Sequence, residues 1–309
     1  MFVVHYRKFF FALSALLTVG AIVAMMVYGF NFGIDFKGGS ILEVSYPMAT
    51  SSPVSTRPAI EAVRNNIDTL NLGGYLVQPS GADRFVLKTR ELDQAKKTEV
   101  LKALSADGVT LPKEERFNTI GPVVGNELKN KAYVAIALVI LCIVLFVTFA
   151  FRKVSKPVSS WKYGFVTVLA LVHDVIVPTG VYVLYTHFRA GEIDLLFVAA
   201  ILAILGYSVH DTIVVFDRVR ENLRINRDTR SSEDFETTVG KSVSQTFGRS
   251  INTSLTIFLV LLALYFVGGE ATRNFALVLL VGVIAGTYSS IFLASPLLVT
   301  IGGAKATAK

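Results

Sequence analysis

The hydrophobic positions of this chain are gathered into long blocks rather than spread along its length. Each block runs for about 20 residues with few or no charges, which is the length that crosses roughly 30 Å of hydrocarbon as an α-helix. Pro296 lies in the last block and is expected to end or bend that helix. The pattern therefore predicts a membrane protein with transmembrane helices over residues 9–28, 132–151, 163–185, 195–216, 251–267 and 275–301.

The first block has the position of a signal peptide but lacks its other features. It follows Arg7 and Lys8, has the full length of a membrane span, and is not followed by an A-x-A-like cleavage site. We therefore expect an uncleaved first helix.

Composition supports the membrane class and excludes several functions. Of the 309 residues, 52% are hydrophobic and 17% are charged, whereas soluble chains carry about a quarter charged residues. A net charge of +7 would suggest a nucleic-acid partner in a soluble protein, but cytoplasmic loops of membrane proteins also collect Lys and Arg, so we expect no nucleic acid. The one cysteine, Cys142, leaves no intramolecular disulfide. The sequence shows neither a metal-ligand cluster nor a nucleophile–base set, so we expect no metal, no cofactor and no enzymatic activity.

The charges of the connections predict which side of the membrane each one faces. The connections between spans two and three and between spans four and five are strongly basic, while the short connections 186–194 and 268–274 are not. The positive-inside rule then places both termini and both basic connections in the cytoplasm. The basic residues are Arg152, Lys153, Lys156, Lys162, Arg218, Arg220, Arg224, Arg227, Arg230, Lys241 and Arg249.

The connection after the first span is long enough for a folded domain, which would lie on the side of the membrane opposite the cytoplasm. Alternation and helical periodicity predict the order βαββαβ, with Asp93 as a helix N-cap, and this order is the ferredoxin-like arrangement. The fold class is thus a membrane all-α bundle of six transmembrane helices with an inserted α+β, ferredoxin-like, extracytoplasmic domain. The predicted strands are 41–46, 75–78, 84–89 and 114–120, and the predicted helices are 57–70 and 93–105. The predicted division is 1–28 (first helix), 29–130 (domain), 131–301 (helices two to six) and 302–309 (cytoplasmic tail).

Two aspartates lie inside predicted spans, where a charge costs roughly 2.5–3.5 kcal/mol on insertion scales. Asp174 is near the middle of span three and Asp211 is in the cytoplasmic half of span four. Because a low-dielectric environment favours the protonated form of a carboxyl group, both are candidates for a proton relay. The adjacent His173 and His210 are weaker candidates, since a histidine at a helix contact commonly only donates a hydrogen bond. The alternative for each aspartate is a structural bridge between helices.

Arg249 lies at the predicted cytoplasmic entrance of span five. Asp211 is about 8 Å from the cytoplasmic end of its own span, at 1.5 Å per residue, so Arg249 reaches a similar depth if its helix begins one turn earlier. An Asp211–Arg249 pair that forms and breaks with protonation would act as a switch. The alternative is an arginine that extends to the lipid headgroups.

Small residues recur every four positions in the last span, at Gly282, Gly286 and Ser290. This spacing predicts close helix packing, either within the bundle or against a partner. Residues 235–247 predict an amphipathic helix on the inner leaflet.

Glycines lie at both links between the predicted domain and the membrane. Gly38 and Gly39 precede the domain, and Gly121 and Gly125 follow it. They predict hinges for a rigid-body tilt of the domain, with plain turns as the alternative.

Five stretches carry a family resemblance, in order, over nearly the whole chain: 33–40, 121–128, Val172-His173-Asp174, 207–222 and 245–254. Together they resemble the SecF family of protein-export membrane subunits, within the SecD/SecF proteins of the resistance–nodulation–division superfamily. Six spans with a domain inserted after the first match one half of such a transporter, which implies a partner that supplies the other half.

The resemblance implies a multi-pass subunit of the Sec translocase in the bacterial inner membrane. Its implied partners are SecD, the SecYEG channel, YajC, the SecA-driven translocase and preprotein substrates. Proton flow through the helices is implied to move the outer domain, which helps to draw exported chains out. Asp211 and Arg249 align with the family's proton-pathway residues, and His210 departs from the family, where a polar amide is common.

Two other functions compete with this one. Half of a proton-coupled exporter of lipids or small molecules would need a larger outer domain with a binding cavity than the connection 29–130 provides. A passive scaffold subunit would make Asp211 merely structural.

Overall fold

The computed structural model describes residues 2–46, 57–105, 111–152, 158–189 and 191–303. The chain divides into two compact units. The helical unit contains Met1–Asn31, Val134–Gly191 and Leu196–Lys309, and the sheet unit contains Phe32–Tyr133 and Glu192–Leu195. Two of the basic residues named above, Lys153 and Lys156, and positions 304–309 of the predicted tail lie outside the described residues.

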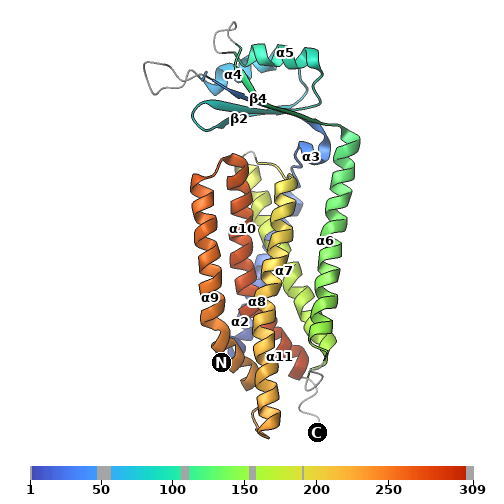
Figure 1. Ribbon diagram of the computed structural model, residues 1–309, viewed down its shortest axis with the longest axis vertical. Coiled ribbons are helices and arrows are strands. Elements are labelled where there is room, and N and C mark those ends of the chain that lie inside the picture. The colour runs from blue at the N-terminus through green and yellow to red at the C-terminus, as the bar shows by residue number, and fades with distance from the viewer. Residues whose placement is uncertain (1, 47–56, 106–110, 153–157, 190, 304–309) are drawn as a thin grey trace. The chain divides into compact units, whose positions relative to one another are not determined.

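In the described residues, six helical segments are long and apolar enough to cross a membrane, which confirms the predicted spans. The last of them, Thr272–Gly302, is built from three consecutive elements. Figure 1 shows α2, α7, α8, α9 and α10 running lengthwise through the helical unit. The helices are α1 (Phe2–His5), α2 (Arg7–Tyr28), α6 (Pro122–Ala150), α7 (Ser160–Arg189), α8 (Leu195–Asp228), α9 (Phe235–Val267), α10 (Glu270–Tyr288), the π-helical turn η1 (Ser289–Ala294) and α11 (Ser295–Gly303).

Several helices are longer than predicted: α6 begins at Pro122 rather than at 132, and α8 ends at Asp228 rather than at 216. Two further differences concern α9 and the last span. The predicted amphipathic segment 235–247 is not a separate helix, because it forms the first part of α9 and continues without a break into the span. The last span does not end at Pro296: the chain forms the π-helical turn η1 just before it and continues as α11. A wider turn of this kind releases backbone hydrogen bonds where a proline could not donate one.

Glycines allow the closest approaches between helices of this unit. A β-carbon on Gly282 would lie 2.2 Å from Ile204 Cδ1, and one on Gly286 would lie 3.1 Å from Ser208 Cβ, so the small residues of α10 face α8 within the bundle. On α7, a β-carbon on Gly180 would lie 2.4 Å from Ala21 Cβ on α2. The bundle is therefore the packing partner of these small residues.

The sheet unit has the predicted order of strands and helices. Its four strands form an antiparallel sheet in the order β2-β3-β1-β4. Asp93 is the N-cap of α5, as predicted, and its Oδ1 accepts a hydrogen bond from the Lys96 N–H at 2.8 Å. The elements are α3 (Ile34–Lys37), β1 (Gly39–Ser45), α4 (Ile60–Asp68), β2 (Tyr75–Ser80), β3 (Arg84–Thr89), α5 (Gln94–Ala103) and β4 (Lys113–Ile120).

One face of this sheet packs against its two helices. Alternate residues of β1 and β3, such as Leu42 and Phe85, are buried with Ile67 of α4 and Val100 of α5, as the period of two in a strand requires. Tyr46 joins this core, and its hydroxyl donates to the Leu104 carbonyl at 2.5 Å. Burial raises the pKa of Tyr46 above its usual value, which keeps this hydroxyl a donor.

The glycine contacts of the helical unit lead to a matched test. Gly180→Ala is expected to destabilise the helical unit, because its methyl group collides with the backbone and side chain of Ala21. Gly206→Ala has no atom within 4 Å of the new methyl group and is expected to be neutral or slightly stabilising, since Ala is the better helix former by about 1 kcal/mol. Thermal unfolding of the purified protein in detergent measures both, and equal melting temperatures would contradict the packing.

The core of the sheet unit is expected to depend on Leu42. Leu42→Ala removes a fully buried side chain and should lower the local stability of the sheet unit by about 2–5 kcal/mol. Leu111→Ala makes the same change at an exposed position and is the control. Amide hydrogen exchange of the full chain reports both, and similar exchange of β1 and β3 in the two variants would argue against this core.

Candidate functional site

A buried carboxyl group lies where three helical segments of the bundle meet. Asp174 on α7 has no exposed surface. Its Oδ1 lies 2.8 Å from His173 Nδ1, and its Oδ2 accepts hydrogen bonds from the hydroxyls of Ser208 on α8 and Ser289 on η1, the latter at 2.6 Å. Both oxygens of Asp174 are therefore satisfied by side chains from neighbouring helices, as a polar group in a low-dielectric interior requires.

The π-helical turn η1 brings hydroxyl groups to this place. Ser289 reaches Asp174, while the next residue, Ser290, forms a 2.8 Å hydrogen bond with Thr212 of α8 and reaches the Ser208 carbonyl at 3.4 Å. Ser295 in turn donates to the Ser290 carbonyl at 3.0 Å. Single π turns inside α-helices are frequent at functional sites, and this one lines the contact between α8 and the last span.

The second buried carboxyl group is only half satisfied. Asp211 on α8 is 6% exposed, and its Oδ1 accepts a hydrogen bond from Ser250 of α9 at 2.6 Å. Its Oδ2 is buried and has no hydrogen-bond partner within the described parts of the chain. A buried carboxylate oxygen without a partner is costly, and this leaves Oδ2 as the open position of the site.

Ser208 and Asp211 lie one helical turn apart on α8 and so share a face of that helix. The two acids therefore bond to a common stretch of α8, Asp174 from α7 through Ser208 and Asp211 directly. A further cluster of hydroxyls lies one residue before Ser208. Tyr207 donates to Ser254 of α9 at 2.6 Å, and Thr287 of α10 donates to the same Ser254 at 2.7 Å.

The arrangement can hold and move protons among side chains of four helices. Carboxyl, imidazole and hydroxyl groups each accept and donate, and the structure lines them along α8 in an otherwise apolar bundle. Within the described residues no hydrogen bond joins Asp174 directly to Asp211, so a proton that passes between them needs a mobile hydroxyl or water.

The predicted site residues divide between this cluster and the surface. Asp174, His173 and Asp211 are buried in it, whereas His210 and Arg249 are exposed. Neighbouring positions on a helix point about 100° apart, which is why Ser250, and not Arg249, faces Asp211. The Asp211–Arg249 pair is absent from the described ion pairs and stays a prediction for a different state.

The predicted hinge glycines have mixed surroundings in the sheet unit. Gly38 and Gly39 adopt φ of 79° and 144°. A β-carbon on Gly125 would lie 2.9 Å from the Gly38 nitrogen, and one on Gly38 would lie 2.8 Å from Pro122 Cα, so these positions need glycine for close approach of the two links. Gly121 has nothing within 4 Å of such an atom. Hinge motion itself stays a prediction.

The sequence contains a signal for these hydroxyl groups. Thr287, Ser289, Ser290 and Ser295 fall close together in a span that is otherwise apolar, and small-residue spacing alone points only to Ser290. Polar side chains inside a membrane helix commonly bond across to other helices, so this run points to a polar contact of the last span.

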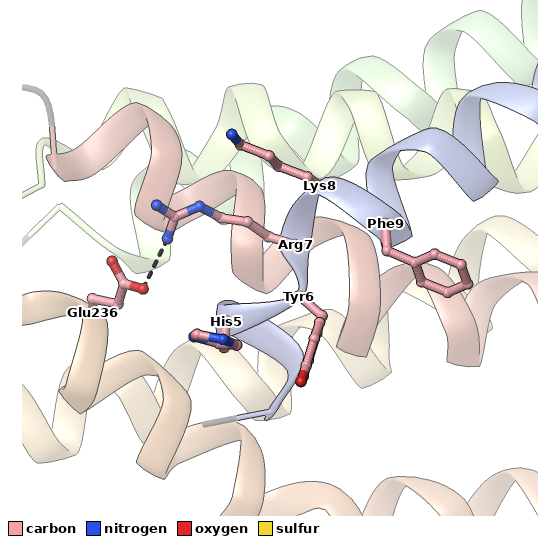
Figure 2. Close-up of a pocket in the computed structure, with 6 residues that line it drawn as sticks. All are labelled: His5, Tyr6, Arg7, Lys8, Phe9 and Glu236. Atoms are coloured by element: carbon pink, nitrogen blue, oxygen red, sulfur yellow. Dashed lines mark ion pairs between the residues drawn. The ribbon is translucent and has the colours of Figure 1, made fainter.

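A separate charged pocket lies at the start of the chain. Figure 2 shows the Arg7 side chain directed at Glu236 of α9, with which it forms an ion pair at 2.9 Å. The pocket is lined by His5, Tyr6, Arg7, Lys8, Phe9 and Glu236. It contains none of the predicted proton-pathway residues.

The long apolar helices and the buried acids among hydroxyls define a multi-pass membrane protein with a polar cluster inside its bundle. The family described as protein export membrane protein SecD/SecF, C-terminal, matches residues 100–304, and the SecD/SecF GG motif matches residues 23–46. This chain belongs to the SecD/SecF family of protein-export membrane proteins.

Individual relatives match nearly the whole chain. A protein translocase subunit SecF from Thermobaculum terrenum is 40% identical over 96% of this chain and 93% of its own length. The protein of the same name from Anaerolinea thermophila is 35% identical over 95% of this chain and 91% of its own length.

Solved structures of SecDF proteins are also similar to this chain. The crystal structure of SecDF, a translocon-associated membrane protein from Thermus thermophilus, superposes with a TM-score of 0.78 at 30% identity. SecDF in a super-membrane-facing form superposes with a TM-score of 0.67 at 31% identity. The match covers 97% of this chain but only 38% of either SecDF chain, so the SecDF chains contain much that this chain does not.

The hydrogen bonds of Asp174 predict two different outcomes at one position. Asp174→Ala leaves His173, Ser208 and Ser289 without their partner and is expected to lower the stability of the helical unit by about 2–4 kcal/mol. Asp174→Asn keeps an acceptor for the two hydroxyls and should cost less. Thermal unfolding in detergent measures both, and an alanine variant as stable as the unchanged protein would refute this network.

Proposed function

We propose that this chain is the SecF-type subunit of the bacterial Sec protein-export machinery. In this proposal it acts with SecD and uses the proton-motive force to promote the translocation and release of secretory proteins. Family membership supports the export role, as do relatives named protein translocase subunit SecF that align over more than nine tenths of their length. The role is that of a transport subunit rather than an enzyme.

The proposed setting is the cytoplasmic (inner) membrane, with both termini in the cytoplasm and the sheet unit outside. The basic connections support this orientation, because short cytoplasmic loops collect Lys and Arg. We assign the inserted unit a ferredoxin-like fold. The order β2-β3-β1-β4, with helices after β1 and β3, supports this assignment.

The proposed partners follow from the longer SecDF relatives and from exposed apolar helix faces. The SecDF chains that it resembles are much longer, and we infer that SecD supplies the remaining part. The apolar stretches of α6 and α9 are mostly not buried inside the protein. Such exposed apolar faces support contact with lipid or with another membrane chain. SecYEG, YajC, the SecA-driven translocase and preproteins are the further partners that the family implies.

The proton pathway is proposed to run through Asp211, with Asp174, His173, His210 and Arg249 as further members. The observation that carries it is the buried Oδ2 of Asp211, which has no hydrogen-bond partner among the described residues. A buried carboxylate oxygen without a partner is costly, so Oδ2 is the position open to a proton or to a new donor. Proton uptake at that oxygen removes the charge, and release restores it. Arg249 lies beside Ser250 and is the cation available to pair with the charged form after a rotation of α9.

Asp211→Asn is expected to reduce proton-driven export strongly, by about tenfold or more, because the amide cannot cycle a charge at a relay position. The measurement is translocation in inverted membrane vesicles that contain SecD, with and without a proton gradient. Asp217→Asn is the matched control, because it makes the same change on the same helix at a side chain that is 62% exposed.

The two possible outcomes of this test have different meanings. Loss of the gradient-dependent part of export, in a variant that still assembles with SecD, supports a proton carrier at Asp211. Normal export in Asp211→Asn would instead show that the carboxylate only bridges α8 and α9, and the passive scaffold would then be the better account.

A further inference from the structure

The short connection between α7 and α8 is bonded to the sheet unit. Its residues Glu192 to Asp194 and the first residue of α8, Leu195, belong to that unit, although α7 and the rest of α8 belong to the helical unit. The backbone N–H of Gly33 donates to the Ile193 carbonyl at 2.8 Å, and Phe32 and Ile193 form a parallel β-bridge. Ile193 is 3% exposed, so this contact is packed rather than superficial.

An ion pair adds to this contact from the sheet itself. Lys88 on β3 lies 2.8 Å from Glu192 Oε2, and the two side chains are only 21% and 14% exposed. The backbone beside them is close as well, because a β-carbon on Gly33 would lie 3.3 Å from Glu192 Oε2. An ion pair with this little solvent is screened far less than one on an open surface.

The first residue of α8 is held by the segment that leads into the sheet. Asp35 Oδ2 accepts a hydrogen bond from the backbone N–H of Leu195 at 3.0 Å. The first N–H groups of a helix have no partner within the helix, and a carboxylate there also interacts favourably with the helix dipole. Asp35 therefore caps α8 although it lies far away in the sequence.

We propose that the α7–α8 connection is a third attachment between the sheet unit and the membrane helices, and that Asp35, Lys88 and Glu192 are the positioning residues that transmit helix displacement to the sheet. The other two attachments are the covalent links from α2 into β1 and from β4 into α6. The proposal rests on the proposed function, because α7 carries Asp174 and α8 carries Asp211.

The length of the connection explains why it transmits movement. Arg189 is the last residue of α7 and Leu195 the first of α8, so few residues are available to absorb a shift of either helix. A displacement of α8 that follows a change of charge at Asp211 moves Leu195 along the same rigid helix. Leu195 and Ile193 then move the segment that contains Gly33 and Asp35, to which they are bonded.

Charge exchange across the ion pair tests the coupling. Lys88→Glu and Glu192→Lys each place like charges together and are expected to lower gradient-dependent export by about fivefold or more, the lower end of typical coupling between sites. The double variant Lys88→Glu, Glu192→Lys restores the pair and should restore export. Lys97→Glu is the control, because Lys97 forms a 2.8 Å ion pair with Glu114 within the same unit and does not contact the connection.

Hydrogen exchange tests the attachment without using export. In the SecD-containing complex, Asp35→Ala should speed amide exchange at Leu195 by about fivefold, since it removes a hydrogen bond to a charged group. Asp35→Asn retains an acceptor oxygen and should lie close to the unchanged protein. Lys88→Glu should also speed exchange in the connection, and the double charge exchange should reverse this.

The results that would overturn the proposal are distinct from those that would overturn the proton pathway. Unchanged exchange in Asp35→Ala would show that the attachment does not hold α8. Faster exchange with normal export in Lys88→Glu, or a loss of export that the double variant does not restore, would show that the attachment transmits nothing. Normal export in Asp211→Asn would refute the proton pathway. The hydrogen-exchange measurements would still decide independently whether the attachment exists.

Discussion

A carboxylate inside a membrane must be satisfied by its own protein, and in this chain that requirement fixes how the helices meet. Asp174 has no exposed surface, and its oxygens are bonded by His173, Ser208 and Ser289. These bonds join α7 to α8 and to the π turn of the last span. They need a short distance between backbones, which Gly286 provides by letting α10 approach Ser208 so closely that a β-carbon on the glycine would lie 3.1 Å away. In hydrocarbon, where apolar contact alone gives helices little reason to associate, such bonds and close contacts specify the packing.

The two buried acids differ in how fully their oxygens are hydrogen-bonded. Asp174 has side-chain partners on both oxygens. Asp211 has Ser250 on one oxygen and none of the described groups on the other. A buried carboxylate oxygen without a partner is costly, so Oδ2 of Asp211 is open to a proton or to a new donor. The same helix, α8, therefore carries one serine that anchors a neighbouring acid and one acid that is open to change.

The sequence predicted what depends on local periodicity and missed what depends on helix phase. Spans, strands and the Asp93 cap follow from short-range patterns, and the structure contains them. The strands agree within a few residues, whereas helices such as α6 (Pro122–Ala150) and α8 (Leu195–Asp228) run much further into the flanking polar segments than hydropathy alone indicates. The π turn at Ser289 could not be predicted, because it shifts the hydrogen-bond register by one residue in response to packing and Pro296. The choice of Ser250 over Arg249 as partner of Asp211 depends on a rotation of about 100° per residue, which a span assignment uncertain by a few residues does not resolve.

The glycines in the links between the two units also show what a sequence alone does not predict. The sequence predicts hinges at four glycines, because a glycine needed for flexibility cannot be distinguished in a sequence from one needed for close backbone approach. The four are Gly38, Gly39, Gly121 and Gly125. In the structure, rotation at Gly38 would break its packing against Pro122, and Gly125 lies against the Gly38 backbone, so these glycines hold the two links together. Gly121 alone among the four has open space around it. If the sheet unit tilts, the packed positions must move as one body and the backbone change must fall where no close contact opposes it, which favours Gly121 over its neighbours.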